Sequence, residues 1–415
     1  MSQLDIALAS IGAVVLCLGI ISQAIKRGPL QEPLIAVAVG ILIGPYGLDW
    51  LDIAAWGDST VILEQAARLA LAIGLMGVAL RLTRRDIIEL WRPVGLLLIV
   101  AMLGMCALSS AIAGWWLGVP LWTAVLIGAA LTPTDPVVAS SIVTGKFAEE
   151  HLPDRIRDSI SLESGANDGL AYMFVMLPIL LLHASPAEAW QRWLTETLLL
   201  GVVVATAIGV AMGWGAARLL HWAKERGLIE SYSFLTYTVA LSLFTLGGAT
   251  LIGADALISV FAAGLAFNLA SETSEKHEEE SVQEAVNKLF TLPMFVLFGL
   301  ALPFSDWARL GWPLLAAAIL ILILRRLPVV AALFPALRAT YSAADCAYIG
   351  WFGPIGIAAV YYAAFAVKHT GEEIIWTATS AAILASILAH SLTAAPFTRW
   401  YARRSDPSYS DVAAT

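Results

Sequence analysis

The sequence has 415 residues, of which 59% are hydrophobic and 13% are charged, and its formal net charge is −8. About a quarter of the residues of a soluble domain are charged, so this composition excludes an ordinary soluble enzyme or binding module. Apolar runs such as residues 6–25 and 198–220 match the about 20 residues that cross a bilayer core. We therefore expect an all-α polytopic membrane protein.

Hydropathy windows of about 19 residues predict about 13 transmembrane helices. In chain order they are residues 4–25, 32–48, 60–82, 92–117, 121–145, 159–183, 195–219, 231–250, 253–270, 287–303, 313–335, 344–367 and 374–397. We expect residues 1–404 to form one transmembrane unit and residues 405–415 to form a short cytoplasmic tail.

Basic residues follow every odd-numbered span, whereas the alternate loops hold only Arg192, Arg309 and Lys368. Cytoplasmic loops carry an excess of Lys and Arg, so the N-terminus should lie outside and the C-terminus in the cytoplasm. The location we expect is a bacterial inner membrane. The acidic stretch at residues 272–284 is expected to be a solvated cytoplasmic loop with a short surface helix, and a regulatory role for it stays open.

Two predicted spans carry prolines in their middle. In the fifth, Pro133 and Pro136 flank Asp135, and the twelfth reads Gly-Pro-Ile-Gly at residues 353–356. Proline removes a backbone donor and disfavours a helical conformation in the preceding residue, so both helices should break at membrane depth. The breaks lie seven spans apart in segments of opposite direction. This predicts an inverted repeat, spans 1–6 against spans 8–13, with a transport site at the breaks; the alternative is two unrelated proline kinks.

Three acidic residues fall at membrane depth, where each charge costs on the order of 3 kcal/mol or more. Asp135 lies at the first break, and Glu163 and Asp168 lie on the sixth span. One base, Arg326, lies at comparable depth and can neutralise one carboxylate, and Glu163 is the favoured structural partner. An unpaired buried carboxylate binds either a proton or a cation.

Helical spacing places Ser164 and Asp168 on one face of the sixth span, and Glu163 and Asn167 on the neighbouring face. Carboxylates, hydroxyls and freed carbonyls are hard ligands that suit alkali cations. A site whose acids choose between a proton and such a cation has the chemistry of an exchanger.

At these residues the chain resembles the monovalent cation:proton antiporters of the NhaP and sodium–proton exchanger type. The segment Thr134-Asp135-Pro136 matches the family's motif on its broken fifth helix. Glu163-Ser164 and Asn167-Asp168 match its motif on the sixth. The two motifs at this spacing are specific, and the resemblance covers nearly the whole chain.

The resemblance implies that Asp168 binds the cation and the proton, and that Asp135, Ser164 and the Thr134 carbonyl complete the cage for Na⁺ or K⁺. It implies site-structuring roles for Asn167, Glu163, Arg326, Pro133 and Pro136. Asn167 would orient the broken helix, and Glu163 would form a salt bridge with Arg326. Electrogenic relatives carry a second aspartate at the position of Asn167, so electroneutral exchange of one cation for one proton is implied.

The resemblance also implies the sodium/proton antiporter fold, in which two discontinuous helices cross. Spans within residues 1–90 and 231–303 would form an interface domain. Spans within 92–183 and 313–397 would form a core that moves as an elevator, and residues 195–219 would be the linker helix. A homodimer in membrane lipid is implied. We expect no cofactor and no nucleic-acid partner, only the transported Na⁺, Li⁺ or K⁺ and H⁺.

Two positions depart from the family pattern. Many members carry an arginine after the glycine-proline of the twelfth helix, where this chain has Ile355. Many also carry a glutamate in the third helix, where residues 75–78 contain no acid. Glu64 lies on the same span near its outer end, and we expect it to pair with Arg68 four residues on. The choice between Na⁺ and K⁺ therefore stays open.

Two other functions are weighed against antiport. A sodium-coupled symporter for an organic anion would need basic residues near the breaks, and Arg326 should be occupied by Glu163. A non-transporting sensor would leave Asp135 and Asp168 without a reason. Enzyme chemistry is the least supported, because no nucleophile–base pairing is visible.

Overall fold

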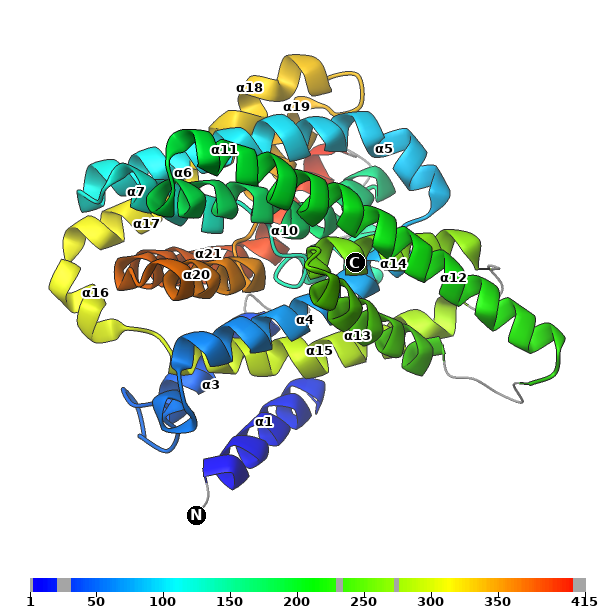
Figure 1. Ribbon diagram of the computed structural model, residues 1–415, viewed down its shortest axis with the longest axis horizontal. Helices are drawn as coiled ribbons and strands as arrows, with labels where there is room; N and C mark the ends of the chain where they lie inside the picture. Colours follow the sequence, from blue (N-terminus) through cyan, green and yellow to red (C-terminus); the bar gives the residue numbers. More distant parts are fainter. Residues whose placement is uncertain (1–2, 21–30, 229–233, 272–275, 406–415) are drawn as a thin grey trace.

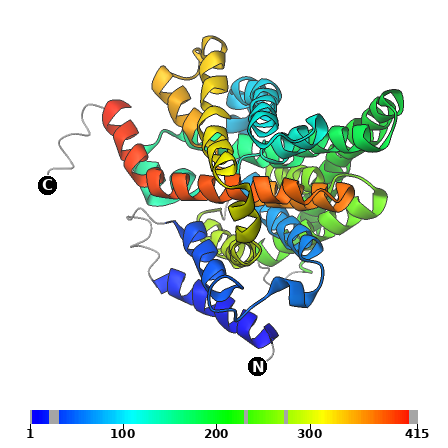
Figure 2. The same cartoon turned by 90° about the vertical axis from the view of Figure 1, so that its left-hand side faces the viewer.

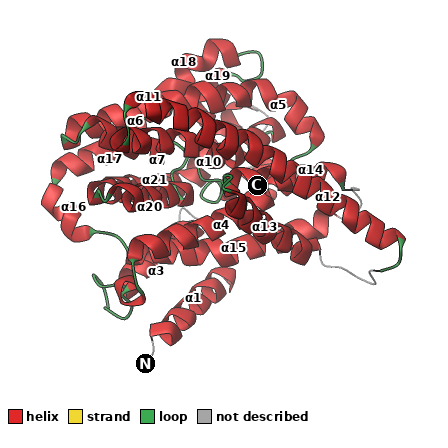
Figure 3. Ribbon diagram, in the orientation of Figure 1, coloured by secondary structure: helices red, strands yellow, loops and turns green. Residues whose placement is uncertain are grey.

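The computed structural model describes residues 3–20, 31–228, 234–271 and 276–405. Every regular element within these ranges is a helix (Figures 1 and 3). The bilayer core offers backbone groups no water partner, so helices that satisfy their own hydrogen bonds are the expected solution. Acidic side chains mark two of the helix starts. The Asp58 carboxylate accepts from the Thr60 amide at 2.8 Å, and Asp255 accepts from the Ile258 amide at 2.8 Å.

The first half of the chain contains α1 (Gln3–Ile20), α3 (Glu32–Ile43), η1 (Ile53–Trp56), α4 (Ser59–Arg81), α5 (Arg84–Leu96), η2 (Leu97–Ala101), α6 (Met102–Leu117), α7 (Leu121–Ala130), α8 (Ser140–Val143), α9 (Gly145–His151) and α10 (Asp154–His183). The second half contains α11 (Pro186–Arg192), η3 (Trp193–Val204), α12 (Ala205–Glu225), α13 (Phe234–Ile252), α14 (Ala256–Ala270), α15 (Lys276–Leu300), α16 (Phe304–Leu310), α17 (Trp312–Leu324), α18 (Leu327–Leu337), α19 (Ala343–Trp351), α20 (Ile357–Thr370) and α21 (Glu373–Ser405).

Seven helical stretches of the described residues are long and apolar enough to cross a membrane. An eighth is counted if α15 and α16, which meet at a 53° bend, form one span. The protein is therefore a multi-pass membrane protein, but the predicted count of 13 spans is not confirmed. Several predicted spans are short or interrupted helices, such as α3 with 12 residues and α7 with 10.

Both predicted helix breaks are present. Helix α7 ends at Ala130 and helical structure resumes at α8, whereas α19 ends at Trp351 and α20 begins at Ile357. The two non-helical segments meet, because the Asp135 amide donates to the Pro354 carbonyl at 2.8 Å. The proline pattern thus predicted both breaks, and the family resemblance implied that they cross.

The helix packing has the exchange symmetry that an inverted repeat requires. Helix α3, the second predicted span, packs on α15, the tenth, and α4, the third, packs on α14, the ninth. If span 2 corresponds to span 9 and span 3 to span 10, each contact is the image of the other. A glycine allows close approach in both: a Cβ on Gly40 would lie 2.1 Å from the Val296 carbonyl, and one on Gly264 would lie 2.7 Å from the Ala79 Cβ.

The helices with the predicted site lie together in the middle of the molecule. Helices α7, α10 and α20 pack against one another, and α21 packs on α20 and α17 (Figure 1). Figure 2 shows α21 as a long helix that crosses the molecule from side to side. These contacts bring the two breaks to the buried face of α10.

The helix in the acidic stretch is longer than expected. The acidic stretch 272–284 is expected to be a solvated loop with a short surface helix; in the structure the helix of this stretch is not separate, because α15 begins at Lys276 and continues into the apolar segment. Residues 272–275 lie outside the described residues, as do residues 406–415 of the expected tail.

Candidate cation site

Asn167 fastens the first broken segment to α10. Its side-chain oxygen accepts from the Thr134 amide at 3.0 Å, and its side-chain nitrogen donates to the Thr134 hydroxyl at 2.7 Å. The same hydroxyl lies 3.0 Å from the Ser164 hydroxyl. Pro133 and Pro136 break the helix on both sides of Thr134. The Thr134 amide therefore lacks a helical acceptor and donates to the Asn167 side chain in its place.

The Asp135 carboxylate caps helical starts at the crossing. One oxygen accepts from the amides of Val137 and Val138 at 2.6 and 3.2 Å, and the other accepts from the Ile357 amide at the start of α20. A negative charge is favourable at a helix N-terminus, where backbone amides lack partners. A Cβ on Gly356 would lie 2.0 Å from the nearer carboxylate oxygen, so only glycine lets α20 approach this closely. Asp135 is thus satisfied by backbone amides and needs no basic partner.

Arg325 contacts the helix C-termini at the crossing, whereas Asp135 contacts the N-termini. Its guanidinium donates to the carbonyls of Leu131 and Gly353, which follow the ends of α7 and α19. It also lies 3.4 and 3.3 Å from the carbonyls of Thr132 and Pro133. A positive charge is favourable at helix C-termini, where carbonyls lack partners. Arg325 and Asp135 therefore compensate the four helix ends that meet here.

Arg325 was missed by the sequence reasoning, which placed only Arg326 at this depth. Adjacent residues on a continuous helix point in different directions, so a single inward arginine was the natural expectation. Instead, α17 ends at Leu324 and α18 begins at Leu327 with a proline in its first turn. Both arginines lie in the turn between the helices, and both are buried. Pro328, which directly follows Leu327, was the available signal.

Glu163 and Arg326 form the expected ion pair. Two parallel bonds of 2.6 Å join the guanidinium to the carboxylate, and both side chains are at most 3% exposed. Arg326 also donates to the Ile349 carbonyl at 2.9 Å. The pair connects α10 to the turn between α17 and α18 and to α19.

The energetics of this pair give a prediction. Glu163→Gln should destabilise the protein by about 3–5 kcal/mol, because it leaves Arg326 buried without a counter-charge. The double variant Glu163→Leu/Arg326→Met should lose much less than the sum of the single losses, since it removes both desolvated charges. Thermal and denaturant unfolding of the purified variants would measure this. Additive losses would contradict the assignment of a coupled pair.

Asp168 differs from the other acids of the crossing. It is fully buried on α10, and neither carboxylate oxygen has a hydrogen-bond partner among the described residues. Its main-chain carbonyl accepts from the Tyr362 hydroxyl of α20 at 2.6 Å, which ties this turn of α10 to the second broken helix. The sequence analysis left both Asp135 and Asp168 without a partner. In the structure, Asp168 alone of these two has no partner among the described residues.

Comparison with known proteins identifies the family of the chain. Residues 12–400 match the family described as "Sodium/hydrogen exchanger, transmembrane".

The chain belongs to the sodium/hydrogen exchanger family.

Relatives of this chain occur in yeasts and bacteria. It is 31% identical over 379 residues to "Na(+)/H(+) antiporter 2" of Zygosaccharomyces rouxii, which covers 87% of this chain and 46% of that protein. It is 25% identical over 396 residues to "K(+)/H(+) antiporter NhaP2" of Shewanella sp. (strain MR-4), which covers 93% of this chain and 66% of that protein. The chain thus spans less than half the length of the yeast relative.

The fold is shared with a solved structure. The structure of "the sodium proton antiporter MjNhaP1 from Methanocaldococcus jannaschii" superposes with a TM-score of 0.74, covering 97% of this chain and 99% of that one. The sequence identity is 17%, so this likeness shows the fold alone.

One expectation about this exchanger-family chain is wrong. Glu64 does not pair with Arg68. Its carboxylate lies 2.7 Å from the Lys368 ammonium at the end of α20, and Arg68 donates to Gln65 and Thr250. The spacing of four residues allowed the local pair, but Glu64 is buried on the side of α4 that packs on α20. A contact between distant segments prevailed over the local one.

The other family departure has a structural counterpart. Ile355 is buried, and its amide donates to the Ser386 hydroxyl at 2.8 Å. Where many family members carry an arginine at this place, this chain places the Arg325 guanidinium on the Gly353 carbonyl two residues earlier.

Proposed function

We propose that the protein is a secondary active antiporter that exchanges Na⁺, Li⁺ or K⁺ for H⁺ at Asp168. One observation carries this proposal: the Asp168 carboxylate is fully buried, and both its oxygens lack a partner among the described residues. A bare carboxylate at membrane depth is costly until it binds a proton or a cation. Binding of one excludes the other, and this competition couples the two flows.

The proposed ligands beside Asp168 are oxygen atoms. Ser164 lies one helical turn before Asp168, and its hydroxyl is already in contact with the Thr134 hydroxyl. The Thr134 carbonyl belongs to the broken segment and completes the proposed cage. Carboxylate, hydroxyl and carbonyl oxygens suit an alkali cation.

Asp135 contributes to this cage in a more limited way than the sequence suggested. A carboxylate offers about four acceptor positions, and three backbone amides already occupy the Asp135 oxygens. At most one position therefore remains for a cation or a bridging water. We propose that Asp135 chiefly holds the break in shape beside the ion.

The wider transport cycle is also a proposal. Helices within 92–183 and 313–397 would move as a core against an interface formed by helices within 1–90 and 231–303, in a homodimer. The break-bearing helices gather in the first group, whereas the α3–α15 and α4–α14 contacts lie in the second. The charge alternation supports an N-terminus outside and a C-terminus in the cytoplasm. A bacterial inner membrane stays a prediction, since relatives occur in yeasts and bacteria.

The symporter alternative has no support at the crossing. An organic anion would need a basic partner there. Arg326 is held by Glu163, and Arg325 is held by backbone carbonyls. Neither guanidinium is left for a carboxylate substrate.

Cation-driven proton movement in proteoliposomes tests the proposal. With an imposed pH gradient, addition of Na⁺, Li⁺ or K⁺ should dissipate the gradient, and the rate should not change when a membrane potential is imposed at fixed ion gradients. Asn167→Asp places a second titratable carboxylate beside Asp168, so its rate should depend on the potential. No response to any of the three cations would refute antiport. A potential-dependent wild type would refute only the electroneutral stoichiometry.

A further inference from the structure

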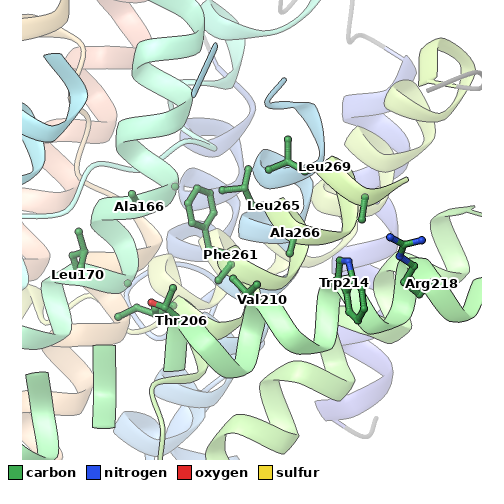
Figure 4. A pocket seen from close by; sticks show the side chains of 15 residues that line it. Ala166, Leu170, Thr206, Val210, Trp214, Arg218, Phe261, Leu265, Ala266 and Leu269 are labelled. Atoms are coloured by element: carbon green, nitrogen blue, oxygen red, sulfur yellow. The ribbon is translucent and has the colours of Figure 1, made fainter. Parts of the chain in front are cut away.

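A cavity of about 770 Å³ lies between α10, α12 and α14, on a different face of α10 from the cation site (Figure 4). Its α12 wall is formed by Thr206, Val210, Trp214 and Arg218, which follow one another every four residues and so lie on one face of the helix. We call this cavity the α12 groove. Its α10 wall includes Gly165 and Gly169, the residues directly after Ser164 and Asp168.

The α12 groove has the length of one membrane leaflet. From Thr206 to Arg218 the chain advances twelve residues, about 18 Å at about 1.5 Å per residue. The hydrocarbon core of a bilayer is about 30 Å thick, so one leaflet contributes about 15 Å. Figure 4 shows Thr206 near one end of the groove and the Arg218 guanidinium at the other.

The walls of the α12 groove are apolar. Side chains of Phe261, Leu265 and Leu269 line it from α14. The Thr206 hydroxyl donates to the Val202 carbonyl at 2.7 Å, so its hydrogen is already used within α12. Val210 and Leu269 are 46% and 48% exposed, which leaves the groove open along its side. A hydrocarbon chain fits these walls, whereas a polar solute would find few partners.

Small residues create the space. Glycine and alanine line the groove at many positions on α10 and α14, including Ala266 in the middle of the α14 wall. Helix α12 approaches α14 closely at Gly209 and Gly213, where a Cβ would lie 2.2 and 2.0 Å from carbonyls of α14. The groove is therefore bounded by a tight helix pair, and its shape is fixed by backbone contacts.

The Arg218 end of the groove is polar and positively charged. The Arg218 guanidinium lies over the Trp214 ring, 5.3 Å from its centre. Among the described residues that line the groove, Arg218 is the only charged one, and no described carboxylate forms a salt bridge with it. Tryptophan is enriched where hydrocarbon meets headgroups, and a long arginine side chain near a helix end reaches the same level. Basic residues beside transmembrane helices on the cytoplasmic side attract anionic lipids. This end of α12 is followed by basic residues, so the charge alternation of the loops predicts that it lies on the cytoplasmic side.

We propose that the α12 groove binds one acyl chain of an anionic phospholipid, with the lipid phosphate on Arg218. The apolar walls, the leaflet-scale length and the unneutralised guanidinium at the cytoplasmic end together select this ligand class. The bound chain would contact Gly165 and Gly169 of α10, the helix that carries Asp168. Binding itself does not depend on the proposed function.

Lipid binding to the purified full-length chain tests this site. Native mass spectrometry and thermal unfolding in detergent would be recorded with phosphatidylglycerol and with phosphatidylcholine of identical acyl chains. The wild type should bind phosphatidylglycerol more tightly and be stabilised more by it. Arg218→Ala should weaken phosphatidylglycerol binding about fivefold and leave phosphatidylcholine binding almost unchanged.

The chain offers a matched control. Arg226 lies over Trp222 at 5.6 Å, with the same four-residue spacing on the same helix end, but outside the groove. Arg226→Ala should leave binding near the wild-type value. Equal losses in the Arg218 and Arg226 variants would show general surface attraction and overturn the headgroup assignment.

A second variant tests the acyl-chain position. Ala266→Trp fills the groove without changing a charge, so it should reduce binding of both lipids while the protein remains folded. Unchanged lipid binding in Ala266→Trp would place the acyl chain elsewhere and overturn the proposal. A change of oligomeric state without a change of lipid binding would assign the groove to a second copy of the chain and also overturn it.

Discussion

Asp168→Asn should lower cation-driven proton exchange in proteoliposomes to the rate of protein-free liposomes. Asparagine keeps the shape of the side chain but loses the charge that a cation and a proton compete for. The wild-type carboxylate makes no hydrogen bond with the described residues, so its replacement breaks no contact within them. The unfolding temperature of the variant should therefore not fall. Lost exchange together with a retained fold is the signature of a binding residue.

Asp154→Asn is the matched control for this experiment. Asp154 is the first residue of α10, pairs with Arg157 at 2.5 Å and has an 83% exposed side chain. The same chemical change on the same helix, outside the site, should leave exchange at the wild-type rate. If Asp168→Asn also exchanged cations at the wild-type rate, the proposed coupling at Asp168 would be wrong.

An ion pair between two side chains at membrane depth could be predicted from the sequence. Charge is so costly at membrane depth that counting the acids and bases led to the Glu163–Arg326 pair, which the structure contains. Proline chemistry located the breaks at Asp135 and Pro354, because proline removes a backbone donor and disfavours a helical conformation before it. Composition and the long apolar runs predicted the helical membrane architecture, because the bilayer leaves the backbone few choices.

Contacts between a charged side chain and the backbone could not be predicted from the sequence. Every residue carries an amide and a carbonyl, so no sequence pattern marks the amides that Asp135 accepts from or the carbonyls that Arg325 donates to. Counting charges therefore left Asp135 unpaired. The Glu64–Lys368 contact was missed for a related reason, since it joins residues more than 300 positions apart. The α12 groove depends on the space among three helices, which hydropathy does not describe.

The predicted count of 13 spans is not confirmed because several predicted spans contain only short helices. Windows of about 19 residues merge the two halves of a broken helix into one span. Helix α7 and the segment after it were predicted as residues 121–145, but the continuous helix ends at Ala130. The ends of α4 were predicted to within one residue, since residues 60–82 compare with Ser59–Arg81, whereas α15 begins at Lys276 and not at residue 287 and α21 runs on to Ser405.

Arg325→Met should cause a large loss of stability and, with it, of exchange. The substitution leaves at least the Leu131 and Gly353 carbonyls without their donor. Each unsatisfied buried polar group costs about 1–3 kcal/mol, and the positive charge at the two helix ends is lost as well. Arg325→Lys keeps the charge but offers a single ammonium in place of the planar fork. Its unfolding temperature should fall between those of the wild type and Arg325→Met.

The family pattern supplies a rescue experiment for this charge. Many members carry an arginine at the position of Ile355, two residues from the Gly353 carbonyl. Adding Ile355→Arg to Arg325→Met should therefore restore part of the unfolding temperature, and exchange per folded molecule should recover in parallel. A rescue would show that the crossing requires a positive charge at the ends of α7 and α19 and not the bulk of Arg325 alone.

Arg338→Met is the control, because Arg338 is an exposed arginine at the end of α18. Surface substitutions usually change stability by less than about 0.5 kcal/mol, so this variant should unfold like the wild type. Equal unfolding temperatures for Arg325→Met and Arg338→Met would contradict the role assigned to Arg325. A destabilised Arg325→Met that Ile355→Arg fails to improve would mean that the crossing needs the fixed position of the guanidinium between the two carbonyls, and that a charge nearby is not enough.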